Sequence, residues 1–166
     1  MPTIADAGED DLPGILAIYN DVIARTTAVY QEEPVTLENR RAWFASRRAQ
    51  GYPVLAARDE TGVVGFASFG EFRPWPCYRN TVEHSVHVRA DRRGQGVGRS
   101  LIDALLERAR AMGKHVIIAG VDADNAASLH LHQALGFTPV ARFHEVGRKF
   151  DRWLDLVFLQ RILDRA

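Results

Sequence analysis

Three alternating glycines, Gly94, Gly96 and Gly98, lie in the basic stretch VRADRRGQGVGRSL between residues 88 and 101. Glycines spaced in this way allow successive backbone N–H groups to approach a negatively charged ligand. The stretch separates an extended run from an amphipathic one, so the positive end of the following helix would face the same ligand. These residues predict a phosphate site. A glycine-rich turn without a ligand is the alternative that the stretch alone leaves open.

Two familiar phosphate-binding loops do not fit the spacing. A Walker loop needs Gly, four residues and then Gly-Lys-Ser or Gly-Lys-Thr, a string that the sequence lacks. The dinucleotide fingerprint G-x-G-x-x-G, started at Gly94, has Arg99 in place of the third glycine, which permits close helix packing. The pattern that fits is R/Q-x-x-G-x-G, with Arg93, Gly96 and Gly98 at its fixed positions. A pyrophosphate is the ligand expected for such a loop.

The segment TVEHSVHV, residues 81–88, carries a carboxylate and two imidazoles within an alternating, β-branched run. Because side chains alternate along a strand, Glu83, Ser85 and His87 share one face, and His84 lies on the other face with the valines. A surface glutamate on an edge strand is the alternative to a functional role for Glu83.

The preceding loop, RPWPCYRN, contains two arginines, Arg73 and Arg79, with aromatic residues between them. Arginine binds a carboxylate or a phosphinate through two parallel hydrogen bonds, which lysine cannot do. The loop therefore predicts a binding site for an anionic group. A solvated basic loop is the alternative.

Histidines and the single cysteine do not form a metal or nucleophile site in this pattern. His130 and His132 point about 200° apart on a helix, and His84 and His87 lie on opposite faces of their strand. Cys77 lies in a loop with no base assigned to it. We therefore expect no metal.

The elements that must position these residues alternate along the chain in the order β α α β β β α β α β β. A strand–helix–strand unit around the glycine loop predicts a parallel pair with a right-handed crossover, and the hairpins around it predict a mixed sheet. Strands are expected at Thr3–Ala5, in a hairpin over 52–72 that turns at 59–62, and at Thr81–Val88, His115–Val121, Pro139–Val146 and Arg152–Leu159. Helices are expected from Asp10, from a Thr36 N-cap to Gln50, at Gly98–Met112 and at Asn125–Leu135.

Length and composition set broader limits. The 166 residues suit one domain, 1–166, and 46% hydrophobic with 25% charged residues is typical of a soluble globular protein. Lys+Arg and Asp+Glu are balanced at 21 each, so nothing global indicates nucleic acid or an anionic membrane as a partner. The first residues lack the pattern of a secretory signal, and no apolar run reaches the ~20 residues of a membrane span. A lone cysteine favours a reducing compartment, so we expect a cytoplasmic protein.

Two motifs together resemble the GNAT superfamily of N-acetyltransferases. R/Q-x-x-G-x-G after a strand resembles its acetyl-coenzyme A loop, and N-x-x-A/S-x-x-L-Y-x-x-x-G-F is similar to NAASLHLHQALGF at residues 125–137. More narrowly, this segment together with TVEHSVHV and KFDRWLDLVF resembles the phosphinothricin and methionine sulfoximine acetyltransferase branch. The resemblance covers nearly the whole chain. It implies an α/β GNAT fold: a mixed central sheet of about seven strands, flanked by helices, with a splayed central strand pair.

The resemblance also implies an activity. We expect transfer of an acetyl group from acetyl-CoA to the α-amine of a small amino-acid-like acceptor of the phosphinothricin, methionine sulfoximine or methionine sulfone type, by an enzyme that forms a homodimer. An acetyltransferase of protein N-termini or lysines, and a non-catalytic acetyl-CoA sensor, are the competing interpretations.

Residue roles follow from the same resemblance. Glu83 is expected to be the general base, directly or through water, and His132 to protonate the departing thiolate; a locally bonded helix histidine is the alternative. His87, Arg148 and Asp151 depart from the branch's pattern, which leaves the acceptor open. The expected acetyl-CoA contacts are Val86, His87, Val88, Arg93, Gly94, Gln95, Gly96, Val97, Gly98, Arg99, Asn125 and Ser128. The expected acceptor contacts are Arg73, Pro74, Trp75, Tyr78, Arg79, Glu83, His84 and Ser85.

Overall fold

Local sequence signals fix where the helices begin. In the computed structural model, which describes residues 1–163, the Thr36 side chain accepts a 3.1 Å hydrogen bond from the Asn39 N–H and caps α2 (Leu37–Ala49). The Asn125 side chain caps α4 (Ala126–Ala134) in the same way through the Ser128 N–H. A 3-10 turn at Glu9–Asp11 precedes α1 (Leu12–Arg25), which therefore begins two residues after the predicted Asp10.

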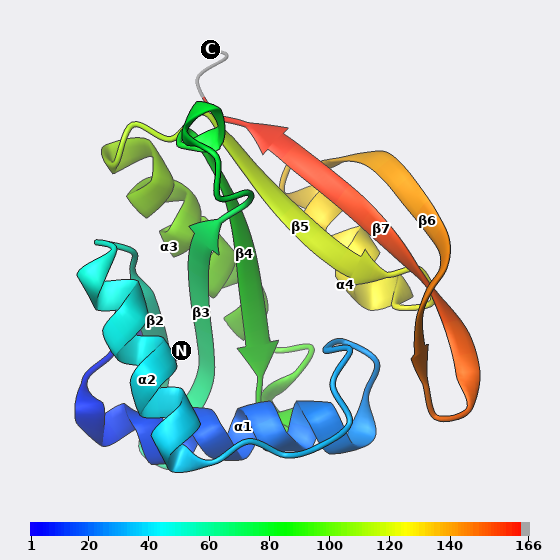
Figure 1. Cartoon of the computed structure of the whole chain (residues 1–166). Helices are drawn as coiled ribbons and strands as arrows, with labels where there is room; N and C mark the ends of the chain where they lie inside the picture. The colour runs from blue at the N-terminus through cyan, green and yellow to red at the C-terminus, as the bar shows by residue number, and fades with distance from the viewer. Residues whose placement is uncertain (164–166) are drawn as a thin grey trace.

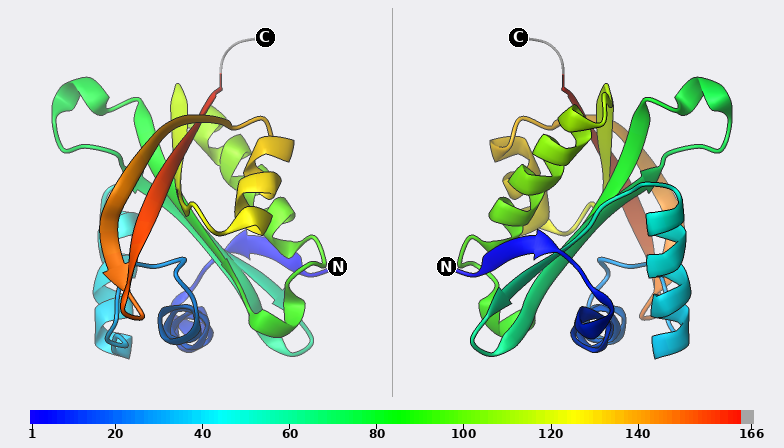
Figure 2. Two further views of the ribbon diagram at one scale, coloured as in Figure 1. Left: turned by 90° about the vertical axis from the view of Figure 1, so that its right-hand side faces the viewer. Right: turned by 90° about the vertical axis from the view of Figure 1, so that its left-hand side faces the viewer.

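Seven strands form one mixed sheet in the order β1-β2-β3-β4-β5-β7-β6. Only β4 and β5 pair in parallel, and α3 (Val97–Ala111) connects them, as the sequence predicts. Helices α1 and α2 cover one face of the sheet, and α3 and α4 cover the other (Figures 1 and 2). The strands are β1 (Thr3–Asp6), β2 (Val54–Asp59), β3 (Gly62–Glu71), β4 (Thr81–Val88), β5 (Val116–Asp122), β6 (Thr138–Lys149) and β7 (Arg152–Ile162).

Each face of the sheet has its own apolar core. Leu101 and Leu105 of α3 are fully buried in one core. Leu12 and Ile15 of α1 pack with Phe66 of β3 in the other. Fully burying each such side chain contributes about 1.5–3 kcal/mol, so the two cores hold β3 and β4 firmly between the helix layers. No helix within residues 1–163 has the length and apolar character needed to cross a membrane.

The central parallel pair opens part-way along. Pairing between β4 and β5 ends at His84 and Ala119, although β4 continues to Val88 and β5 to Asp122. Figure 1 shows the two strands diverging toward α1. This confirms the expected splay. It leaves unpaired the backbone groups of residues 85–88 that point away from β3.

The last hairpin is longer than predicted. Its strands turn at Phe150 and Asp151, which both adopt positive φ (51° and 58°) and so form the left-handed two-residue turn that suits twisted strands. Register shifts interrupt β6 between Phe143 and Gly147, and these bulges break the alternation that predicted an end at Val146.

Candidate active site

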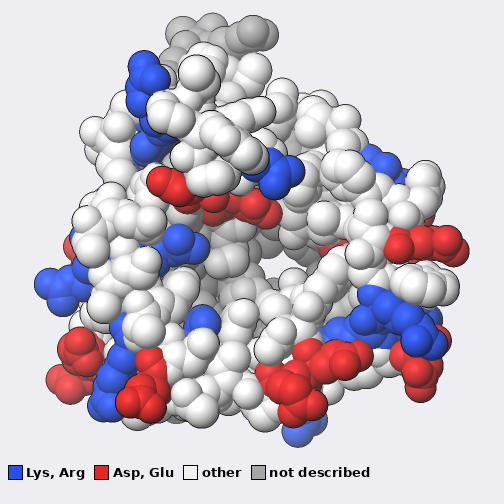
Figure 3. Space-filling model, viewed as in Figure 1, with Lys and Arg blue, Asp and Glu red and all other residues white. Residues whose placement is uncertain are grey.

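Two adjoining cavities meet where β4 and β5 splay apart. The first, about 850 Å³, runs along the glycine loop and is called the cofactor cleft here. The second, about 440 Å³, lies between β4 and helices α1, α2 and α4 and is called the acceptor cavity. Figure 3 shows this face hollowed between the helices and the β6–β7 hairpin, with acidic and basic side chains around the hollow. The two cavities share the lining residues Ala28, Val86, His87, Asn125 and Ser128.

The glycine loop is shaped to receive an anion. Gly94 and Gly96 adopt positive φ (73° and 85°), which favours glycine, and a Cβ on Gly94 would meet no atom within 4 Å. Helix α3 begins directly behind the loop, so its first N–H groups add positive partial charge. The residues therefore fit a pyrophosphate group. Basic side chains also line the cofactor cleft: Arg25, Arg92, Arg93, Arg99 and Arg152.

Glu83 lies half-buried in the acceptor cavity. A Cβ on Gly120 would approach its Oε1 atom to 3.3 Å, so the carboxylate packs against the glycine of β5. Burial raises the pKa of the Glu83 carboxyl, and the positive charge of Arg73 partly opposes this shift. A carboxylate with a raised pKa is the stronger base, as proton abstraction from an ammonium group requires.

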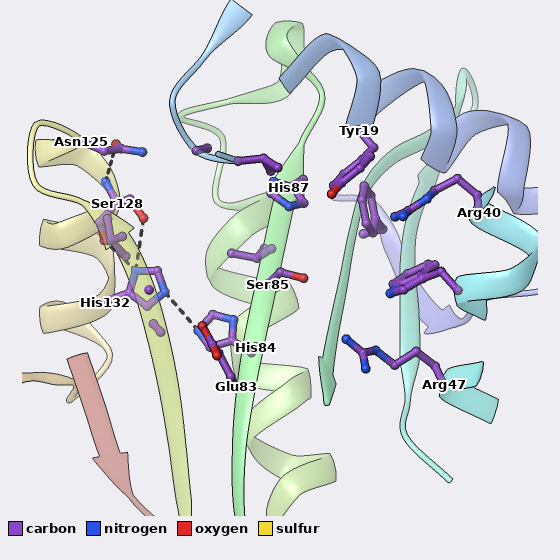
Figure 4. A pocket seen from close by; sticks show the side chains of 18 residues that line it. Tyr19, Arg40, Arg47, Glu83, His84, Ser85, His87, Asn125, Ser128 and His132 are labelled. Atoms are coloured by element: carbon purple, nitrogen blue, oxygen red, sulfur yellow. Dashed lines mark hydrogen bonds between the residues drawn. The ribbon is translucent and has the colours of Figure 1, made fainter. Parts of the chain in front are cut away.

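His84 and His132 form a buried pair that crosses from β4 to α4 (Figure 4). Their Nε2 atoms are 3.1 Å apart, and the Nδ1 atom of His132 is 2.7 Å from the Ser128 carbonyl oxygen. A carbonyl only accepts, so we assign the His132 proton to Nδ1. Neutral His132 then accepts at Nε2 from His84, whose own Nδ1 is left as a buried acceptor without a partner in the described structure.

This pair is neutral near pH 7. Burial lowers the pKa of His84 to about 3, and the neighbouring His132 and His87 add to the shift. Burial also lowers the pKa of His132, against the effect of its bond to Ser128. Both nitrogens of His132 are thus engaged, and the ring can act as an acid only after it takes up a second proton at Nε2, in place of the hydrogen bond from His84.

His87 is buried on the other face of β4. Its ring packs against Tyr19 and Phe66, at centroid distances of 5.8 Å and 5.3 Å. Burial, reinforced by the charges of Arg40 and Arg93, lowers its pKa to about 4, so the ring is neutral near pH 7.

Two arginines of α2 line the acceptor cavity and were not predicted. Arg40 is 8% exposed, and its guanidinium lies 4.2 Å from the Tyr19 ring centroid and 4.9 Å from that of Trp43. Arg47 lies two helical turns further along the same face of α2, and its Nε atom is buried without a hydrogen-bond partner in the described residues. The signal was present in the sequence, because residues 40, 43, 44 and 47 recur at helical spacing on one face.

A buried lysine fixes the segment that separates the two cavities. Lys149 of β6, 2% exposed, donates to the carbonyls of Thr26 and Val29 at 2.7 and 2.9 Å. Thr26 lines the cofactor cleft, Val29 lines the acceptor cavity, and Ala28 lines both. The β6–β7 hairpin therefore holds a wall of the site in place.

The sequence profile of the Acetyltransferase (GNAT) family matches residues 15–137. The chain belongs to the GNAT family of acetyltransferases. An L-methionine sulfoximine/L-methionine sulfone acetyltransferase of Pseudomonas paraeruginosa is 56% identical over 98% of this GNAT chain and 95% of its own length. A phosphinothricin N-acetyltransferase of Alcaligenes faecalis is 39% identical over 98% of this chain and 83% of its own.

Solved structures of GNAT proteins agree with this fold. YncA of Salmonella typhimurium, described as a putative acetyltransferase with its cofactor acetyl-CoA, has a TM-score of 0.95 at 46% identity and covers all of this chain and 96% of its own. A protein of Brucella melitensis described as a ribosomal-protein-alanine N-acetyltransferase has a TM-score of 0.95 at 49% identity, over 97% of this chain and 99% of its own.

Most of the site residues predicted for this GNAT chain line one of the two cavities. Gln95 and Val97 line neither: the Gln95 side chain donates to the Asp91 carbonyl at 3.0 Å, and Val97 is buried in the core. In the acceptor cavity are Glu83, His84, Ser85, Val86, His87, Asn125, Ser128 and His132. In the cofactor cleft are Val86, His87, Val88, Arg93, Gly94, Gly96, Gly98, Arg99, Asn125 and Ser128.

The predicted acceptor loop lies apart from these residues. Arg73, Pro74, Trp75, Tyr78 and Arg79 do not belong to the described lining of either cavity. Arg79 donates to the Pro76 carbonyl within its own loop, and Arg73 stacks on its neighbour Phe72, with its centre 4.9 Å from the ring. Of these five loop residues, only Arg73 affects a group in the acceptor cavity, because its positive charge lowers the pKa of Glu83. Arg148 and Asp151, near the tip of the β6–β7 hairpin, likewise lie outside both linings, although Phe150 and Arg152 beside them line the cofactor cleft.

Proposed function

We propose that this protein transfers an acetyl group from acetyl-CoA to the α-amine of a small amino-acid-like acceptor, of the methionine sulfoximine, methionine sulfone or phosphinothricin type. The observation that carries the proposal is the meeting of the cofactor cleft and the acceptor cavity at the splay, with Glu83 in the acceptor cavity. The names of the curated relatives support this class of acceptor.

The cofactor cleft suits acetyl-CoA, which supplies the activated acetyl group as a thioester. Gly94, Gly96 and Gly98, with the start of α3, would hold its pyrophosphate. Backbone groups of Val86–Val88, left unpaired by the splay, would hydrogen-bond to the rest of the donor. An N–H group among them would stabilise negative charge on the thioester oxygen.

Glu83 performs the proton step at the amine. Its raised pKa allows it to take a proton from the acceptor ammonium group, directly or through a water molecule, so that the free amine can attack. His132 remains our predicted proton donor to the departing thiolate. To act so, the neutral ring must first take up a second proton at Nε2, which now accepts from His84, and the lowered pKa of His132 opposes this protonation.

A panel of amines tests the proposal. Purified protein with acetyl-CoA is offered methionine sulfone, methionine sulfoximine, phosphinothricin and a peptide with an N-terminal alanine, and thiol release is measured. We expect turnover of the amino-acid-like acceptors, since the 440 Å³ cavity suits a small molecule. Turnover of the peptide alone would favour the protein acetyltransferase that the Brucella melitensis structure is named for, and acetyl-CoA binding without any turnover would favour a sensor.

We also propose that the protein forms a homodimer and works in the cytoplasm. Strand β6 is one of the two edge strands of the sheet, and Val140, Phe143 and Val146 are exposed on it, which is typical of a surface that pairs with a second copy. Light scattering should give the mass of a dimer, and Val146→Lys should shift it toward the monomer. Cell fractionation tests the location, for which the exposed free thiol of Cys77 is the support.

A further inference from the structure

Two arginines face the acceptor cavity and form no ion pair with a carboxylate of the described residues, although the more distant Glu71 acts on Arg47 through its charge. Arg40 donates from Nε and Nη2 to the Asn39 side chain, and its Nη1 group has no hydrogen-bond partner in the described structure. No ion pair or hydrogen bond of Arg47 is found within residues 1–163 either. Arg40 is buried, and the Nε atom of Arg47 is buried without a hydrogen-bond partner in the described structure. Leaving such charged groups unsatisfied is costly, so the two arginines indicate that the occupant of the cavity is negatively charged or rich in oxygen atoms.

Arg40 is held rigidly. Its guanidinium is stacked between the rings of Tyr19 and Trp43, and this stacking fixes its plane while leaving the Nη1 edge available. Its charge acts on His87, which places it at the end of the acceptor cavity that adjoins the cofactor cleft. In Figure 4, Arg40 extends from α2 toward β4 at this end.

Arg47 lies at the other end, beside the proposed base. Gly70 of β3 is the direct cross-strand partner of Glu83, and a Cβ on Gly70 would lie 2.1 Å from Nη1 of Arg47. The guanidinium therefore occupies the space of the missing Gly70 side chain. Directly paired residues of an antiparallel pair share a face at about 5 Å, so Arg47 lies over the strand position next to Glu83, on the same face of the sheet.

We infer that Arg47 binds the α-carboxylate of the acceptor and Arg40 binds oxygen atoms on its side chain, so that the two arginines select amino acids with an oxygen-bearing tail. The inference rests on the proposed function, because it assigns the acceptor of that same site. The carboxylate is assigned to Arg47 because the amine that Glu83 deprotonates and the carboxylate share one carbon atom. Residues seven apart on α2 are about 10.5 Å apart along the axis, a span that one such acceptor can bridge.

Three acceptors that differ by one group test the two assignments. Methionine sulfone carries both the carboxylate and the tail oxygens, methionine lacks the tail oxygens, and decarboxylated methionine sulfone lacks the carboxylate. The variants Arg47→Met and Arg40→Met are compared with Arg48→Met and Arg41→Met, which remove exposed arginines from the same helix. The kcat/KM of each acceptor and the calorimetric Kd of acetyl-CoA are measured.

Arg47→Met should lower kcat/KM at least tenfold for the two amino acids and leave the decarboxylated amine within threefold. Arg40→Met should lower it at least tenfold for methionine sulfone and leave methionine within threefold. Both should leave the acetyl-CoA Kd within threefold, and the two control variants should match the wild type. Gly70→Ala, which keeps the charge of Arg47 but must displace its guanidinium, should reproduce the Arg47→Met pattern if that variant folds poorly.

Variants that keep the wild-type preference among the three acceptors would overturn the inference while the proposed function stands. A wild-type protein that binds acetyl-CoA but acetylates none of the three acceptors would overturn the proposed function itself.

Discussion

Removal of the Lys149 ammonium group should weaken binding in both cavities, although this residue lines neither. In Lys149→Met the chain keeps a side chain of similar length but loses the two hydrogen bonds to the carbonyls of Thr26 and Val29. The residues between those carbonyls, Thr27 and Ala28, must then be ordered when ligands bind. At about 1 kcal/mol for the backbone of each residue, the cost is about 2 kcal/mol, or roughly 30-fold in affinity.

Other anchors reduce this effect. The Tyr30 hydroxyl still donates to the Asp155 carbonyl at 3.0 Å, and the Asn20 side chain still bonds both backbone groups of Val35 at 2.9 Å. We therefore expect the acetyl-CoA Kd and the acceptor KM each to rise between about fivefold and 30-fold, with kcat nearly unchanged.

Calorimetry and steady-state kinetics measure these two quantities, and circular dichroism establishes that the variant is folded. Lys114→Met is the matched control, since Lys114 also donates to a backbone carbonyl, that of Arg79 at 2.7 Å, but neither Lys114 nor Arg79 lines a cavity. A folded Lys149→Met protein whose Kd and KM equal those of the control would refute the reasoning.

Further predictions concern the base and the glycine loop. Glu83→Gln should lower kcat about 10²–10⁴-fold and leave the acetyl-CoA Kd unchanged; a kcat within twofold of wild type at neutral pH excludes the role. The wild-type kcat/KM should fall as pH drops through the raised pKa of Glu83, and Arg73→Gln should move this acid limb to higher pH, because removing the positive charge raises that pKa further. A raised KM with an unmoved limb would instead indicate that Arg73 binds the acceptor. Gly96→Ala should weaken acetyl-CoA at least tenfold, about 1.4 kcal/mol, whereas Gly51→Ala, which also has positive φ, should not.

The features that could be predicted from the sequence are those whose causes are local. The glycine loop, the Thr36 cap and the alternation of β4 depend on residues a few positions apart, and the structure confirms all three. Element boundaries shifted where a bulge or a 3-10 turn intervened, as in β6 and before α1.

The missed parts of the site depend on contacts between distant residues. His84 and His132 are both expected in the site from the sequence, but they are 48 positions apart, so the direct contact between their rings could not be predicted. The sequence does not determine which face of α2 points at the gap in the sheet, so it does not predict that Arg40 and Arg47 line the acceptor cavity. The sequence favours the loop of Arg73 because it directly precedes β4 in the chain, whereas its side chains lie outside the described cavity linings.

The gap between β4 and β5 leaves two unpaired strand edges in the centre of the sheet, where backbone amides are normally shielded from solvent by a neighbouring strand. Half of the amide protons from Ser85 to Val88 have no strand to bond to on that side, so they should exchange with solvent quickly although β4 is central. A ligand that bonds to them acts as a removable strand, and its binding adds to the free energy of unfolding, by about 2.7 kcal/mol at 100 times its Kd. Under the proposed function, the supply of acetyl-CoA would therefore govern the lifetime of the folded enzyme as well as its rate.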